Sequence, residues 1–222
     1  MTSGKTGKVS PQDELARKEK LLAFEKIRWA EGFSFVAGVD EAGRGCMAGP
    51  VVAAACILPA GCVIPGLNDS KKLTPKQRDR LFDAVRESAL SYAVGMASPE
   101  EIDELNILNA TMLAMRRAIE GLPVPADFAL IDGNCARGIA IPHKTVISGD
   151  ALSVSIAAAS ILAKVTRDRI CLENDREYPE YGFAKHKGYG TKEHMDALRR
   201  LGPCPLHRRS FLKFLSDGEN GK

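Results

Sequence analysis

The sequence predicts an α/β fold in which a mixed β-sheet carries helices on its faces. Two observations lead to this prediction. Short apolar runs, as expected of buried strands, alternate along the chain with longer segments whose apolar residues recur at helical spacing. The first two apolar runs, at 35–39 and 51–58, are joined by a Gly-rich segment, so we expect a hairpin before the alternation of strands and helices begins.

The expected elements follow one another in a simple order. Residues 12–31 show helical spacing, and a loop with three turn signals (Pro59, Gly61 and Pro65-Gly66) precedes the next helix. In chain order we expect helix 12–31, strand 35–39, strand 51–58, loop 59–68, helix 74–89, strand 91–97, helix 98–119, strand 126–131, strand 143–147, helix 152–174, helix 191–201 and helix 208–215.

Several helix starts carry local signals. Thr74 suits the N-cap position, and Pro75 suits the first helical position. The segment 98–101, Ser-Pro-Glu-Glu, opens another helix with acids in its first turn, and helical spacing then continues as far as Ile119. Residues 156–163 are apolar almost all round, so the helix that contains them should be buried.

Length and composition set the class of protein. The chain has 222 residues, of which 45% are hydrophobic and 27% charged, as in ordinary globular proteins. No apolar run approaches the roughly 18–20 residues of a membrane span, and the N-terminus lacks the apolar core of a signal peptide. The six cysteines form no C-x-x-C pair, so we expect reduced thiols, a cytoplasmic location and no membrane partner.

The distribution of charge is more informative than the net charge of +3. Between Lys164 and Lys213 the sequence has 12 Lys and Arg against 7 Asp and Glu. This excess fits either a nucleic-acid-binding face or a solvated basic surface, and charge alone does not separate the two.

Carboxylates follow the ends of three apolar strands. They are Asp40 with Glu41, Asp132 before a glycine, and Asp150 after a glycine. Ligands in open sheets bind beyond strand ends, and clustered acids raise one another's pKa values unless a cation is present. Oxygen ligands favour Mg²⁺ or Mn²⁺, and two such ions promote phosphodiester hydrolysis. The alternative for any single site is a turn or a helix cap, above all for Asp150.

The segment Gly43-Arg44-Gly45 offers flexible backbone donors around one guanidinium, which suggests a phosphate or sugar site beside the acids. A dinucleotide-binding loop is the other interpretation. We give it little weight, because the last glycine spacing is one residue too long and a strand follows where a helix is needed.

These residues resemble the ribonuclease HII family of the ribonuclease H-like superfamily over nearly the whole chain, from about Leu15 to Phe211. The first matching block, GVDEAGRG, occupies residues 38–45. The others, in the same order as in the family, are 48–52, 68–73, 132–133, 149–151, 155–168, 186–191 and 207–211. Several long motifs in the right order make the match highly specific.

The resemblance implies a ribonuclease H-like fold, with a mixed five-stranded sheet flanked by helices and a C-terminal helical extension. It divides the chain into a disordered lead at 1–10, a catalytic domain with an N-terminal helix at 11–172, and a substrate-binding lobe at 173–222. It also implies an endoribonuclease that cuts 5′ of a ribonucleotide in duplex DNA or in RNA/DNA hybrids. The products would carry a 3′-hydroxyl and a 5′-phosphate, and the role would be removal of misincorporated ribonucleotides and RNA primers.

The same resemblance assigns residue roles. Asp40, Glu41, Asp132 and Asp150 would hold two Mg²⁺ or Mn²⁺ ions, with Asp40 bridging both. Gly43, Arg44 and Gly45 would recognise the ribonucleotide 2′-hydroxyl, for which glycines allow close backbone approach. Tyr189 would stack on the deoxyribose that follows; apart from the family, a tyrosine packed on a turn is equally expected.

Further substrate contacts are expected just before the helix at 74 and in the basic tail. Asn68, Ser70 and Lys71 would bind phosphate, although an ordinary helix cap is the alternative. Plausible clamps on the nucleic-acid backbone are Lys164, Arg167, His186, Lys187 and Arg208. Histidines and serines in this tail would serve equally well as hydrogen bonders in the core.

Two positions depart from the family pattern. Cys46 stands where the family usually has proline, which would place a thiol beside the substrate and expose it to oxidation. Leu152 stands where the family often has a polar residue, so one contact near Asp150 would be lost. Neither change touches an expected metal ligand, and we still expect activity.

Two other functions stay open on sequence alone. One is a ribonuclease that acts chiefly on long hybrids, as ribonuclease HIII does, and the other is a non-catalytic nucleic-acid-binding module. Four acids count against the second, because a binder of phosphate gains nothing from clustered negative charge. We expect a monomer. The apolar residues 211–215 suggest contact with a replication clamp at a terminus, which a packed terminal helix would explain as well.

Overall fold

The structure is a computed structural model that describes residues 16, 19–67, 70 and 73–212. The expected disordered lead at 1–10 lies outside the described residues. The elements run in the order α2 (Ala23–Ala30), β1 (Val36–Ala42), β2 (Val51–Ile57), α3 (Pro75–Ser88), β3 (Ser91–Ala97), α4 (Pro99–Leu105), α5 (Ile107–Glu120), β4 (Phe128–Asp132), β5 (His143–Val146), η2 (Gly149–Ala151), α6 (Val154–Glu177), η3 (Pro179–Tyr181), α7 (Phe183–His186), α8 (Lys192–Leu201) and η4 (Arg209–Phe211).

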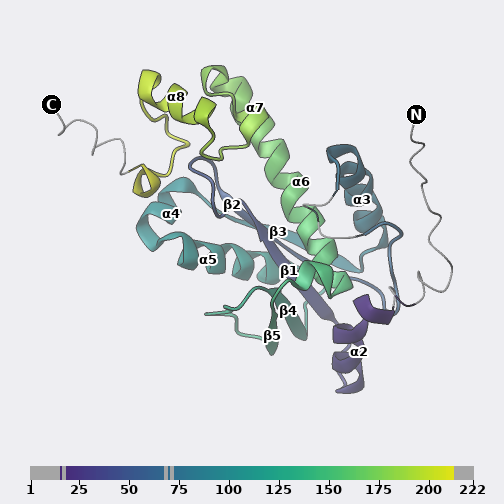
Figure 1. The fold of residues 1–222 in the computed structure, drawn as a ribbon. Helices are drawn as coiled ribbons and strands as arrows, with labels where there is room; N and C mark the ends of the chain where they lie inside the picture. The colour runs from purple at the N-terminus through teal and green to yellow at the C-terminus, as the bar shows by residue number, and fades with distance from the viewer. Residues whose placement is uncertain (1–15, 17–18, 68–69, 71–72, 213–222) are drawn as a thin grey trace, which may run out of the picture.

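The strands form one mixed five-stranded sheet in the order β3-β2-β1-β4-β5 (Figure 1). β1, β2 and β3 pair antiparallel, as a hairpin extended by one strand, whereas β4 and β5 are parallel to β1 and to each other. The predicted mixed sheet of five strands with an initial hairpin is therefore confirmed. β1 is the central strand, and it carries Asp40 and Glu41 near its carboxyl end.

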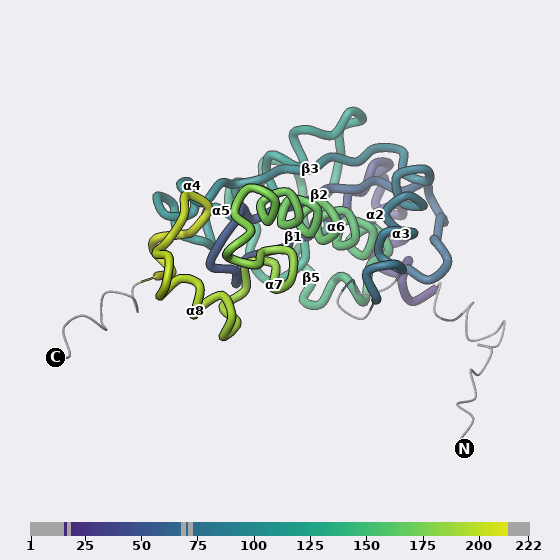
Figure 2. The backbone as a smooth tube through the Cα atoms, turned by 90° about the horizontal axis from the view of Figure 1, so that it is seen from above, coloured from purple at the N-terminus to yellow at the C-terminus, as the bar shows by residue number. Residues whose placement is uncertain are grey.

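Helices cover both faces of the sheet, and the apolar residues of β2 point alternately to one face and to the other. Ala54 and Cys56 belong to the core that α3 and α6 cover, whereas Ala53 and Ala55 belong to the core that α4 and α5 cover. In the view from above, α7 and α8 lie beside the C-terminal part of α6, at the end of the molecule away from α2 (Figure 2). Among the helices of the described ranges, none combines the length and the apolar character needed to cross a membrane.

The helix expected at 98–119 is interrupted. α4 ends at Leu105, and α5 starts at Ile107 after Asn106, which has a φ of 67°. Asn106 tolerates this left-handed backbone, and its side-chain oxygen accepts hydrogen bonds from the N–H groups of Leu108 and Asn109 at 3.0 and 3.1 Å. The prediction of a single helix was wrong because the helical spacing of apolar residues continues across this capped break.

The C-terminal tail also differs in detail from expectation. The helix predicted at 191–201 is α8, but η3 and α7 were not predicted. Of the helix expected at 208–215, the structure shows only the short 3₁₀ turn η4, and positions 213–215 lie outside the described residues. The domain boundary expected after residue 172 falls within α6, which continues to Glu177.

The first turn of α6 lies against β1 in direct backbone contact. A Cβ atom added at Gly38 of β1 would lie 2.0 Å from the carbonyl carbon of Ser155 and 2.1 Å from the N atom of Ile156. Neither atom belongs to a flexible side chain, so only glycine permits this approach. The contact fixes where α6 begins relative to the carboxyl end of β1.

A carboxylate from α2 holds the same end of α6. Glu25 is buried, and its Oε1 accepts hydrogen bonds from the hydroxyls of Ser153 and Ser155 at 2.5 and 2.6 Å and from the N–H of Ser155 at 3.1 Å. An acid at a helix N-terminus is stabilised by the helix dipole and by the unpaired N–H groups there. The helix before β1 thus anchors the start of α6 from its other side.

Substitution Gly38→Ala should therefore destabilise the fold by about 3 kcal/mol, at the upper end of the usual cost of overpacking a rigid site. Urea unfolding followed by circular dichroism measures this loss. Gly45→Ala is the matched control, because a Cβ atom there would meet nothing within 4 Å. An unchanged unfolding midpoint for Gly38→Ala would contradict the backbone contact.

Candidate active site

The carboxyl ends of β1 and β4 bring the expected acids together. The parallel pairing places Val39 opposite Ile131, so Asp40 and Asp132 follow as neighbours at the same edge of the sheet. Asp40 is only 6% exposed, and its Oδ1 accepts a hydrogen bond from the N–H of Glu41 at 2.7 Å. Both residues of the doubled acid lie within β1, which extends three residues beyond the expected strand end.

Asp150 reaches the same edge from the loop before α6. It lies in the 3₁₀ turn η2 and is buried. The N–H of Gly149 donates a hydrogen bond of 2.6 Å to Oδ1 of Asp132, which ties this turn to the end of β4. A Cβ atom at Gly149 would lie 2.6 Å from Cδ1 of Ile156 and 3.2 Å from Oδ1 of Asp132, so the turn packs closely between β4 and α6.

The four carboxylates act on one another electrostatically. The pKa of Asp40 is raised well above its usual value, first by burial and then by the charges of Glu41, Asp132 and Asp150. The structure thus places all four expected acids in one cluster. Among the described residues, no three or more His, Cys, Asp or Glu side chains are arranged as a group that could hold a metal ion.

The donor set nevertheless fits a divalent cation. Acids that raise the pKa of a buried neighbour are repelling one another, and a cation between them removes that repulsion. Carboxylate oxygens are the ligands that Mg²⁺ and Mn²⁺ prefer.

The expected ribose-reading loop lies directly after the acids and has one exposed side. Arg44 and Gly45 are exposed, and Nη1 of Arg44 lies 3.3 Å from Oε1 of Glu41. Gly43 is buried with a φ of 94°, and a Cβ atom there would lie 2.0 Å from Nε of Arg167. Glycine at 43 therefore serves the fold, whereas a Cβ atom at Gly45 would meet no described residue within 4 Å.

Arg208 holds this loop through hydrogen bonds to its backbone on the buried side. Its side chain is fully buried and donates hydrogen bonds to three carbonyl oxygens, those of Gly43 and Arg44 at 2.8 Å and that of Gly49 at 2.9 Å. Burial lowers its pKa to about 10, which still leaves the guanidinium charged at neutral pH. A residue more than 150 positions along the chain thus sets the shape of the loop.

Arg167, His186 and Arg208 are not available as clamps on a nucleic-acid backbone. They are 1%, 7% and 0% exposed. Arg167 donates to the carbonyl oxygens of Lys187 and Ala48 at 2.9 and 3.2 Å, so it joins the tail to the loop. The expectation was wrong because these side chains are buried and donate hydrogen bonds to backbone carbonyls within the protein. The alternative of core hydrogen bonding is confirmed for His186.

Tyr189 presents a partly exposed ring beside the loop. It is 44% exposed, with the guanidinium carbon of Arg167 6.0 Å from the ring centre. Its hydroxyl forms a hydrogen bond with the Cys46 thiol, and burial is the main cause of the raised pKa of each group. Cys46 itself is fully buried, which argues against the oxidation sensitivity that the sequence suggested.

Leu152 is half-buried and packs against the apolar cluster of Val36, Phe128 and Val146. A leucine at this position therefore has a packing role. That contact explains why an apolar side chain is accommodated so close to Asp150.

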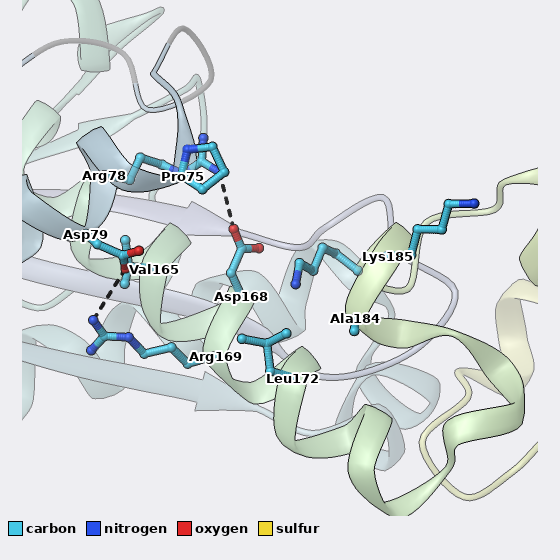
Figure 3. A pocket seen from close by; sticks show the side chains of 10 residues that line it. Pro75, Arg78, Asp79, Val165, Asp168, Arg169, Leu172, Ala184 and Lys185 are labelled. Atoms are coloured by element: carbon cyan, nitrogen blue, oxygen red, sulfur yellow. Dashed lines mark hydrogen bonds and ion pairs between the residues drawn. The ribbon is translucent and has the colours of Figure 1, made fainter.

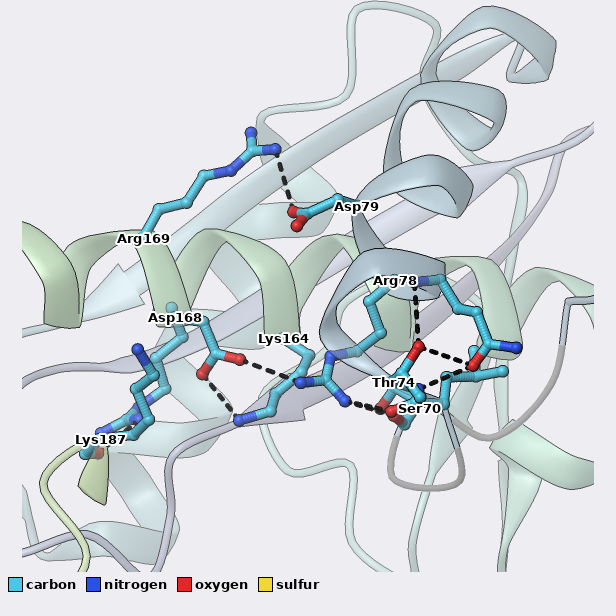
Figure 4. Close-up of polar contacts among 11 residues, drawn as sticks. Ser70, Thr74, Arg78, Asp79, Lys164, Asp168, Arg169 and Lys187 are labelled. Atoms are coloured by element: carbon cyan, nitrogen blue, oxygen red, sulfur yellow. Dashed lines mark hydrogen bonds and ion pairs between the residues drawn. The ribbon is translucent and has the colours of Figure 1, made fainter. Parts of the chain in front are cut away.

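A network of charged side chains supports the segment before α3 (Figure 4). Asp168 of α6 forms ion pairs with Lys164 at 2.7 Å and with Arg78 at 3.6 Å. Arg78 also donates to the carbonyl oxygens of Ser70 and Leu73 at 3.2 and 2.6 Å. Of the expected phosphate contacts, Ser70 is buried and Lys164 is half-buried, whereas Asn68 and Lys71 lie outside the described residues.

Beside this network lies a cavity of about 360 Å³ between α3, α6 and α7 (Figure 3). Its lining includes Arg78, Arg169, Lys185 and Lys187, with Asp79 pairing with Arg169 at 3.5 Å.

The roles of Arg78 and Asp168 in this network were not predicted from the sequence, because an aspartate or arginine on a polar helix face carries no distinguishing pattern.

The fold and the acidic cluster define a class of protein, the ribonuclease H-like nucleases. The crystal structure of ribonuclease H2 from Pyrococcus horikoshii OT3 superposes with a TM-score of 0.70 at 27% identity, covering 84% of this chain and 99% of that one. The ribonuclease HII in a complex with PCNA from Archaeoglobus fulgidus shares the fold, with a TM-score of 0.62 at 24% identity over 78% of this chain and 93% of that one.

Sequence comparison identifies the family within this class. The family model described as ribonuclease HII matches residues 37–214. A ribonuclease HII from Desulfitobacterium hafniense (strain Y51) is 62% identical over 198 residues, which cover 89% of this chain and 76% of the relative. The chain belongs to the ribonuclease HII family and is an endoribonuclease of the ribonuclease H type.

Substitution Asp40→Asn should stabilise the metal-free protein, because it removes one charge from a repelling buried cluster. In EDTA at neutral pH we expect the melting temperature to rise by about 3–6 °C, measured by differential scanning calorimetry. The gain should shrink as the pH falls, because protonation of Asp40 removes the same repulsion in the unsubstituted protein. Exposed Asp83→Asn is the control, and a lower melting temperature for Asp40→Asn would contradict mutual repulsion.

Substitution Arg208→Lys should loosen the loop at 43–49. An ammonium group cannot donate to three separated carbonyls in the plane of a guanidinium, so buried carbonyl oxygens lose their partners, at a cost of about 2–3 kcal/mol. Chemical unfolding gives the cost, and hydrogen exchange should show faster opening at 43–49 than in the sheet. The matched control is exposed Arg209→Lys, and equal protection of the loop in both variants would refute the role of Arg208.

Proposed function

We propose that this protein hydrolyses the phosphodiester 5′ of a ribonucleotide in duplex DNA or in RNA/DNA hybrids, giving a 3′-hydroxyl and a 5′-phosphate. The observation that carries the proposal is the placement of the exposed Arg44-Gly45 backbone directly beside the acidic cluster, with Arg44 and Glu41 in contact. A group that recognises ribose would then lie next to the group that performs hydrolysis.

In this proposal, Asp40, Glu41, Asp132 and Asp150 hold two divalent cations, Mg²⁺ or Mn²⁺, with Asp40 between them. Ions bound there would supply an activated water and stabilise the leaving oxygen of the phosphodiester. The protein's own contribution would be to hold four carboxylates at one edge of the sheet. After burial, the charges of the other three acids raise the pKa of Asp40, which supports a site that favours added positive charge.

Recognition of the substrate falls to the loop and the tail. A Cβ atom at Gly45 would meet nothing within 4 Å among the described residues, which supports close approach of a ribose 2′-hydroxyl to this backbone. Tyr189 offers a partly exposed ring for stacking on the following deoxyribose. Lys164 and the segment around Ser70, with Asn68 and Lys71, would bind the phosphates, and residues 173–222 would form the substrate-binding lobe.

The proposed cellular role is removal of misincorporated ribonucleotides and of RNA primers by a cytoplasmic monomer. Contact with a replication clamp through a terminus is also proposed; of the segment concerned, 211–215, positions 213–215 lie outside the described residues.

The decisive test compares two substrates under identical conditions: a DNA duplex with one ribonucleotide, and a duplex with one all-RNA strand. We expect efficient cutting of the first, with products mapped to the bond 5′ of the ribonucleotide. Asp40→Asn or EDTA should lower kcat by at least about a thousandfold, because several kcal/mol of transition-state stabilisation come from the metal site. Asp83→Asn should cut normally.

Other outcomes would point elsewhere. Slower cutting of the single-ribonucleotide duplex than of the hybrid would favour a ribonuclease HIII-like specificity. Tight binding without product at any Mg²⁺ or Mn²⁺ concentration would favour a binding module, and full activity of Asp40→Asn would refute the metal assignment.

A further inference from the structure

Three buried histidines of the tail form one stacked group behind Tyr189. The rings of His186 and His194 are parallel within 13°, with centres 4.3 Å apart, and His194 and His207 meet through their Nε2 atoms at 3.0 Å. None of the three is more than 7% exposed. A substrate cannot reach them, so their effect on the site must pass through other residues.

The contacts of this group determine where each proton lies. The carbonyl oxygen of Tyr189 can only accept, so Nδ1 of His194, 3.0 Å away, carries the proton and donates it. Nε2 of His194 is then an acceptor, and Nε2 of His207 must donate to it.

The contacts of His207 with Cys204, at the other end of this series of hydrogen bonds, lead to the same assignment. Nδ1 of His207 accepts a hydrogen bond from the N–H of Cys204 at 3.0 Å, and the Cys204 thiol lies 3.1 Å from the same nitrogen. The carbonyl oxygen of Cys204 lies farther away, at 3.3 Å, and already accepts a hydrogen bond from the N–H of His207 at 3.0 Å. Two neutral rings of opposite tautomer therefore satisfy the hydrogen bonds from the Cys204 N–H, between the rings and to the Tyr189 carbonyl. Burial, the largest cause, lowers the pKa of His194 and brings that of His207 to about 4, which keeps both neutral at pH 7.

Tyr189 needs such support because glycines stand on both sides of it. Gly188 has a φ of 78°. On the N-terminal side of Tyr189 the backbone is held by two hydrogen bonds: its own N–H donates to the carbonyl oxygen of His186 at 3.0 Å, and the N–H of Met47 donates to that of Gly188 at 2.8 Å. The Tyr189 carbonyl is held by His194 and by the N–H of Thr191 at 2.8 Å, while the hydroxyl meets Cys46. Of these contacts, only the hydrogen bond from Nδ1 of the His194 side chain to the Tyr189 carbonyl links Tyr189 to the pair His194 and His207.

We propose that His194 and His207 are positioning residues for Tyr189. A directed chain of hydrogen bonds, Cys204 to His207 to His194 to the Tyr189 carbonyl, fixes the peptide of Tyr189 and with it the orientation of the ring that meets the substrate. This inference rests on the proposed role of Tyr189 in checking the deoxyribose after a ribonucleotide.

The measured quantity is the ratio of kcat/KM for the single-ribonucleotide duplex to kcat/KM for the all-RNA hybrid, in which no deoxyribose follows. His194→Leu should lower this ratio about five- to tenfold, the effect expected from losing one orienting hydrogen bond. His194→Asn should restore most of it, because its amide nitrogen can take the place of Nδ1. In a Tyr189→Ala background, His194→Leu should have no further effect on the ratio.

The tautomers of the two histidines can be measured on the unsubstituted protein, so this test does not depend on whether a variant folds. Nitrogen-15 spectra of the histidine rings should show the Nδ1–H tautomer for His194 and the Nε2–H tautomer for His207. The same tautomer in both rings would overturn the relay.

The two levels of the proposal fail differently. If Tyr189→Ala lowers the ratio and folded His194→Leu does not, or if the effects of the two substitutions simply add, the positioning role is wrong and the role of Tyr189 stands. An unchanged ratio for Tyr189→Ala would overturn both.

Discussion

The backbone contact between Gly38 and the first turn of α6 is the constraint on which the site depends. β1 supplies two acids, and the turn before α6 supplies Asp150, so their separation is set by how closely strand and helix approach. Glu25 of α2 holds the start of α6, and Gly149 ties the η2 turn before it to Asp132. Three segments distant in sequence thereby fix one electrostatic cluster, and the cost of gathering like charges is met by rigid packing around them.

A second feature of the structure is that buried arginines hold backbone segments together, each through more than one hydrogen bond. Arg208 and Arg167 donate hydrogen bonds to carbonyl oxygens of the loop and the tail. The opposite side of the loop, at Arg44 and Gly45, is exposed. Guanidinium groups suit this task because several fixed donors act at once. The outer side of the loop is then free for a ligand, and the histidine group braces the neighbouring Tyr189 from within.

Much of this architecture could be predicted from the sequence. Apolar runs indicated the five strands, and acids at strand ends indicated the cluster, because strand periodicity and strand-end position are local signals. The break at Asn106 could not be seen, since helical spacing crosses it. The burial of Arg167 and Arg208 could not be predicted either, because each hydrogen-bonds to a backbone carbonyl more than a hundred residues away, and a basic residue on a solvated face has the same local sequence signal.

α6 joins the two parts of the proposed substrate path in a single rod. It has 24 residues, which corresponds to a length of about 36 Å. The helix starts beside the turn that carries Asp150 and ends where the tail begins, yet the tail returns to the loop after β1 through Arg167 and Arg208. One continuous helix is thus the common support of the acids and of the residues beside them.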